Sequence, residues 1–152
     1  MDVPSIIDPL AVMRVMAFCM MPKEDMISLC SLVAFFTDGR QTNCMVSMAK
    51  RLADERRIFI AGSDNLIERD LPLRTASDFR DEMLVDTGIS RSQVFVDDTA
   101  IYTNGQAASL LRFVRASRQN GRGNMDIIAL CVGGHHIVRA WLTVVAALER
   151  EE

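Results

Sequence analysis

Four short apolar runs recur along the chain, and each is followed by a stretch with apolar residues at helical spacing. The runs cover residues 31–36, 57–62, 93–96 and 125–132, and the helical stretches cover residues 41–55, 75–88, 105–119 and 137–149. Continuous apolar runs are typical of strands buried on both faces, and strands that alternate with helices pair in parallel. The pattern predicts a three-layer α/β/α fold with a doubly wound, mainly parallel sheet of at least four strands.

The first 30 residues precede this alternation. Pro9 suits the first turn of a helix and Asp8 suits its cap, so we expect an N-terminal helical segment over residues 1–30 that packs on the sheet. No linker, repeat or low-complexity stretch divides the rest. Residues 1–152 are therefore predicted to form a single domain.

Composition narrows the class of protein. The chain is 49% hydrophobic and 24% charged, as in globular domains. A formal net charge of -3 argues against a nucleic-acid surface. No apolar run is long enough to span a membrane, and the start lacks signal-peptide features, so we expect a cytoplasmic protein without a membrane partner. The four cysteines lack metal-site spacing, and the apolar surroundings of Cys19 and Cys131 predict buried free thiols.

Ligands of open parallel sheets bind beyond the carboxyl ends of the strands, near the point where the strand order reverses. Four strand-to-helix turns are predicted to meet at that edge. Their candidate ligand-binding residues are Asp38 and Arg40 in the first turn, Gly62 and Ser63 in the second, Asp97 and Asp98 in the third, and Gly133, Gly134, His135 and His136 in the fourth.

The fourth turn, "CVGGHHIVRAW", carries the most specific signal. Two glycines allow close approach of a ligand, and the unpaired amides of the helix that begins near His135 favour an anion. Arg139 is three or four residues from the two histidines, so it can share a helix face with either imidazole. His136 is our candidate catalytic acid or base. The alternative is that one histidine packs on the sheet and the other bonds locally; the spacing specifies no third ligand for a metal.

The acidic pair in the third turn leaves several roles open. Asp97 or Asp98 directly follows a strand and suits ribose hydroxyls, a divalent ion or a histidine partner. Alternatively, Asp98 only closes a turn, and Thr103 and Gln106 form a helix capping box. Thr75 and Asp78 have the spacing of a second capping pair.

The pieces "AGS", "MLVDTGISRSQVFVDD", "YTNGQA" and "HHIVRA" together resemble the YdcF/SanA/ElyC-type family of bacterial proteins. His136, Arg139 and Ala140 match the family's histidine-x-x-Arg-Ala. The chain departs from the family pattern at the first loop, "TDGR", at Ala76 in place of a glutamate, and at Gln106 in place of an asparagine. The resemblance implies a Rossmann-like fold with a polar pocket, and its soluble members look like binders of nucleotide or adenosyl ligands.

Two classes of function follow. The first is a protein that binds a small-molecule ligand, anionic or nucleotide-like, with S-adenosylmethionine or a nucleotide as the candidate cofactor and with catalysis left open. The second is a non-catalytic interaction or scaffold protein that keeps the fold with a degraded pocket. In that case the methionine-rich N-terminal helix would cover a partner or form a homodimer.

Overall fold

The computed structural model describes residues 29–37, 47, 56–64, 75–85, 88–121, 125, 127–133 and 136–150. The N-terminal helical segment predicted over residues 1–30 and the helix predicted over residues 41–55 lie almost wholly outside these ranges. The elements in chain order are β1 (Leu32–Phe36), β2 (Arg57–Ala61), α4 (Ala76–Leu84), the 3-10 turn η1 (Arg91–Gln93), β3 (Val94–Asp97), α5 (Thr103–Gln119), β4 (Ile128–Val132) and α6 (Ile137–Glu149).

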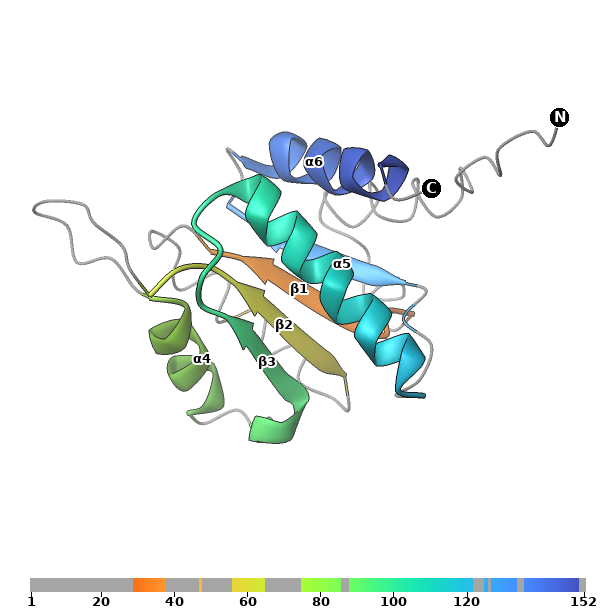
Figure 1. Cartoon of the computed structure of the whole chain (residues 1–152). Helices are drawn as coiled ribbons and strands as arrows, with labels where there is room; N and C mark the ends of the chain where they lie inside the picture. Colours follow the sequence, from red (N-terminus) through yellow and green to blue (C-terminus); the bar gives the residue numbers. More distant parts are fainter. Residues whose placement is uncertain are drawn as a thin grey trace, which may run out of the picture.

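The described strands form one all-parallel sheet in the order β3-β2-β1-β4, so the prediction of an α/β fold with four parallel strands is confirmed (Figure 1). β1 pairs with β2 on one side, Leu32 opposite Arg57, and with β4 on the other, Leu32 opposite Ile128. From β1 the chain adds β2 and β3 on one side and then returns through α5 to add β4 on the other side. The strand order therefore reverses between β1 and β4.

Each face of the sheet buries its own apolar core. Val33 and Phe35 point to the face on which α4 packs, where Phe79 lies edge-on to Phe35 with ring centroids 5.4 Å apart. Their neighbours Leu32, Ala34 and Phe36 point to the other face, because successive side chains of a strand alternate.

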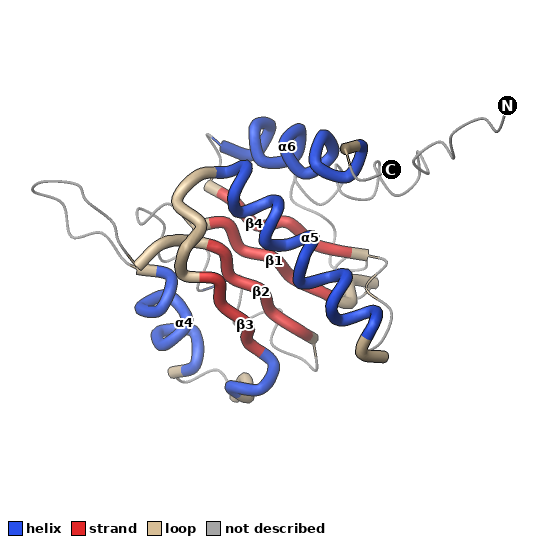
Figure 2. Tube along the Cα trace, in the orientation of Figure 1, coloured by secondary structure: helices blue, strands red, loops and turns tan. Residues whose placement is uncertain are grey.

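That second face carries α5 and α6, which pack side by side (Figure 2). Leu110 and Val114 come from α5, and Ala140 and Val144 from α6. Since these apolar positions recur every three or four residues, each helix has one buried stripe and leaves its other sides free. None of the described helices is long and apolar enough to cross a membrane.

Two buried cysteines belong to the core that faces α4. Cys30 and Cys131 are both buried and neither is in a disulfide bond, as predicted for Cys131. Burial raises the pKa of the Cys30 thiol to about 11, although the positive charge of Arg56 acts in the opposite direction. Cys19 and Cys44 lie outside the described residues.

Candidate functional site

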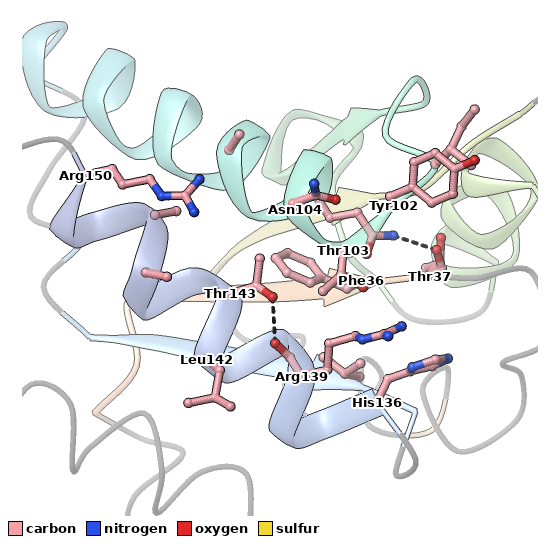
Figure 3. A pocket seen from close by; sticks show the side chains of 16 residues that line it. Phe36, Thr37, Tyr102, Thr103, Asn104, His136, Arg139, Leu142, Thr143 and Arg150 are labelled. Atoms are coloured by element: carbon pink, nitrogen blue, oxygen red, sulfur yellow. Dashed lines mark hydrogen bonds between the residues drawn. The ribbon is translucent and has the colours of Figure 1, made fainter.

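A cleft of about 860 Å³ opens where the strand order reverses, at the carboxyl ends of β1 and β4. Ligand sites of open parallel sheets characteristically occupy this position, and the volume lies within the range of about 300–1,000 Å³ typical of small-molecule pockets. The floor comes from the ends of both strands, and the walls come from the start of α5 and one side of α6 (Figure 3). The lining residues are Phe36, Thr37, Ile101, Tyr102, Thr103, Asn104, Gln106, Ala108, Val132, His136, Arg139, Leu142, Thr143, Ala146, Ala147 and Arg150.

Helix α6 contributes a continuous stripe to the cleft. Arg139, Leu142, Thr143, Ala146 and Arg150 recur at intervals of three or four residues, so they lie on one face of the helix. Other positions of the same helix, Ala140 and Val144, are buried against the sheet. The stripe therefore remains available to a ligand along the whole length of α6.

The predicted pair of His136 and Arg139 meets at the mouth of this cleft. His136 is the N-cap residue of α6, and its backbone amide donates to the Gly133 carbonyl at 2.8 Å, which closes the turn after β4. Figure 3 shows the two side chains next to each other, pointing in the same direction. Among the described residues, no carboxylate forms an ion pair with the exposed guanidinium of Arg139. The imidazole and the guanidinium can thus both face the same ligand group.

Two helix N-termini lie at the cleft without a side-chain cap. The N-cap of α5 is Tyr102 and that of α6 is His136, and neither side chain bonds to the first turn of its helix. The first amides of a helix have no partners within it and carry partial positive charge. By contrast, α4 has both halves of a Thr75–Asp78 capping box, as predicted. The Asp64 carboxylate also accepts from the Ser77 amide at 3.0 Å.

The described residues that line the cleft include basic side chains and no acidic ones. The basic side chains are those of Arg139, Arg150 and His136. This occurs in a chain whose formal net charge is -3. Together with the two uncapped helix ends, the arrangement favours a negatively charged ligand group.

Gln106 holds the start of α5 over the strand ends. Its buried side-chain amide donates to the Thr37 carbonyl at 2.7 Å and to the Ala61 carbonyl at 3.1 Å. The alternative in which Thr103 and Gln106 form a capping box is wrong, because α5 begins at Thr103 itself. Thr103 and Asn104 both line the cleft.

The acidic pair at the end of β3 lies outside the cleft lining. Asp97 is turned toward α5. Its carboxylate accepts hydrogen bonds from the Ser109 hydroxyl of α5 and from the amide and hydroxyl of Thr99, in the loop before α5. The Arg112 guanidinium of α5 lies 3.6 Å from the same carboxylate. Burial would raise the pKa of Asp97, but these hydrogen bonds and the charge of Arg112 bring it below its ordinary value. Asp98 is exposed, and its backbone carbonyl accepts from the Asp64 amide.

Gly62 and Ser63, the candidates after β2, are both buried. A Cβ at Gly62 would overlap Thr37 Oγ1 and would lie 3.1 Å from Ala76 Cβ. Ser63 forms an isolated bridge with Thr99. The second turn thus packs against the first and third turns, and it contributes no residue to the lining of the cleft.

Of the remaining candidates, Gly133 lies at the end of β4 and is half-buried. Asp38, Arg40, Gly134 and His135 lie outside the described residues. The sequence reasoning overlooked the α6 stripe beyond Arg139 and the exposed Ile101 and Tyr102. The stripe had a signal, since Leu142, Ala146 and Arg150 follow one another at four-residue intervals.

No protein-family model, curated protein or solved structure matches the chain. The resemblance to YdcF-type proteins accordingly stays a prediction.

Proposed function

We propose that the protein binds a small anionic ligand in the cleft between β1 and β4, within a three-layer Rossmann-like α/β/α domain. The observation that carries the proposal is the meeting of Arg139 with two uncapped helix N-termini in a cleft whose described lining has no acidic residue. Amides of helix ends and a guanidinium are the donors that commonly bind phosphate and carboxylate groups in proteins.

His136 would be the second contact to the anionic group. It lies next to Arg139 at the mouth of the cleft, at the position where the YdcF-type resemblance places a histidine. If the protein transforms its ligand, His136 is the candidate acid or base, because an imidazole can donate or accept a proton. A nucleotide or S-adenosylmethionine is the ligand that the resemblance implies.

Isothermal titration calorimetry with inorganic phosphate, adenosine monophosphate and S-adenosylmethionine tests the proposal. Loss of one charge-assisted hydrogen bond costs about 1.5–3 kcal/mol, so Arg139→Ala should weaken binding roughly 10- to 150-fold. Arg91→Ala is the matched control, because Arg91 is exposed and precedes β3, at the opposite edge of the sheet. Equal affinities of Arg139→Ala and the wild type would rule the proposed site out.

One observation favours the competing function, an interaction protein. α6 exposes three large apolar side chains: 66% of Val138, 53% of Leu142 and 40% of Leu148 are accessible. Exposed apolar side chains that gather on one element are typical of contact surfaces. A stable dimer in sedimentation experiments that Val138→Glu dissociates, together with no binding of any of the three titrated ligands, would support this function over ligand binding.

A further inference from the structure

The direction of the cleft limits the shape of its ligand. A nucleoside in a Rossmann-like sheet lies along the carboxyl edge of the strands. Here the part of that edge formed by β2 and β3 is filled: Ser63 is buried, the space beside Gly62 is taken by Thr37, and the Asp97 carboxylate is bonded to Ser109 and Thr99. The cleft runs instead along α6, from His136 to Arg150.

The length of this path is set by the helix. Arg139 and Arg150 are separated by three turns of α6, which at the rise of an α-helix corresponds to about 16 Å. In Figure 3 Arg139 lies beside His136 at one end, and Arg150 lies at the other end. A phosphate or carboxylate bound at the first end would leave most of the cleft empty.

Between the two ends most of the lining is apolar. The polar side chains there are Thr143, whose hydroxyl donates to the Arg139 carbonyl, and Thr103 and Asn104 at the start of α5. Leu142 and Ala146 come from α6 and Ala108 comes from α5, and Phe36 lies in the floor. Ile101 and Tyr102 stand at the mouth, with 54% and 74% of their surface exposed. The small side chains of Ala108 and Ala146 leave room for a ligand. The exposed side chains of Ile101 and Tyr102 are removed from water only when a bound molecule covers them.

We propose that the ligand is an amphiphile with one anionic head group and one long alkyl chain, its head at His136 and Arg139 and its chain along α6. This inference rests on the proposed function, because it keeps the same anion site. The two uncapped helix ends and His136 set the orientation, because Arg150 offers the other end of the cleft a guanidinium alone. The head meets Arg139 and the helix ends, and the chain follows the apolar part of the cleft. A fatty acid and an alkyl phosphate share this chemistry.

A chain-length series on the wild-type protein is the primary test. Calorimetry below the critical micelle concentration would compare ethyl, hexyl, octyl and dodecyl phosphate. Each methylene moved from water into an apolar environment should raise affinity about four-fold. Laurate beside dodecyl phosphate identifies the head group, and dodecanol measures the chain without a charge. Equal affinities of ethyl and dodecyl phosphate would overturn the inference while leaving the proposed function intact, and no binding of any anion would overturn both.

Two variants separate the ends of the site. Ala146→Phe fills the middle of the cleft, so it should weaken dodecyl phosphate at least ten-fold and leave ethyl phosphate unchanged. Arg139→Ala should weaken both ligands, and Arg91→Ala neither. Dodecanol binding as tightly as dodecyl phosphate, or dodecyl phosphate affinity that is insensitive to Arg139→Ala, would contradict the inference, because either result would describe an apolar surface without an anion site.

Discussion

Gly62 offers a direct test of how the turns beyond β1 and β2 pack together. Alanine at this position would place its Cβ in the space of Thr37 Oγ1 and 3.1 Å from Ala76 Cβ. The clash is steric, because the positive φ angles among the described glycines are those of Gly88 and Gly121. Thr37 is buried and cannot turn away freely. Overpacking of this kind costs about 1–3 kcal/mol, so Gly62→Ala should lower the free energy of unfolding by that amount.

A double-mutant cycle with Thr37→Ala locates the cause. Once Oγ1 is removed, the new Cβ would face Thr37 Cβ at 3.4 Å, which is an ordinary contact. Thr37→Ala should therefore recover most of the loss, with a coupling energy of about 1–2 kcal/mol, well above the error of such cycles. Urea denaturation followed by circular dichroism measures all four proteins, provided that the m-value stays constant. Additive effects of the two substitutions, or a Gly62→Ala variant as stable as the wild type, would refute this packing.

Three further predictions concern single side chains. The hydrogen bonds of Asp97 keep the pKa of its carboxyl below its usual value. The carboxylate therefore stabilises the fold above about pH 3.9, the pKa of the unfolded state, and this contribution is lost as the pH falls through the pKa of the folded state. Asp97→Asn should lower the free energy of unfolding by about 1–3 kcal/mol at pH 7 and clearly less at pH 2–3, as measured by urea titration. Gln106→Leu should lower the free energy of unfolding by about 1–3 kcal/mol, since it leaves the buried Thr37 carbonyl without the Gln106 donor, whereas the Ala61 carbonyl keeps the Thr37 amide. An unchanged midpoint in urea would contradict this role. Cys30, buried and with a pKa of about 11, should resist iodoacetamide at pH 8 until urea unfolds the protein, as read by peptide mass spectrometry; rapid labelling of the native protein would contradict its burial.

The described elements could be predicted from the sequence because each has a strong periodic signal. The strand predictions match β1, β2, β3 and β4 to within three residues at each end, and the predicted helix over residues 137–149 has the bounds of α6. Double-sided burial makes these strands continuous apolar runs, which is a local property. The order of the strands is not local, and it is this order that places the cleft between β1 and β4.

The site was harder to predict because it depends on the directions of side chains. Asp97 and Asp98 are adjacent, so the sequence cannot say which carboxylate points to the ligand edge; Asp97 is in fact bonded to Ser109 on α5. A shift of one residue in the start of α5 moves Gln106 from the capping position to the next one, where it bonds to Thr37 and Ala61 instead. Such shifts of one residue are within the ordinary uncertainty of helix ends.

Backbone amide shifts during a phosphate titration would test the anion site most directly. In a two-dimensional nitrogen–proton correlation spectrum, the account predicts saturable shifts of the amides of residues 103–105 and 137–139, at the uncapped starts of α5 and α6. The amides of residues 76–78 should stay in place, because α4 is already capped by Thr75 and Asp64. Equal shifts at all three helix starts, or shifts at none, would contradict an anion site at the junction of β1 and β4.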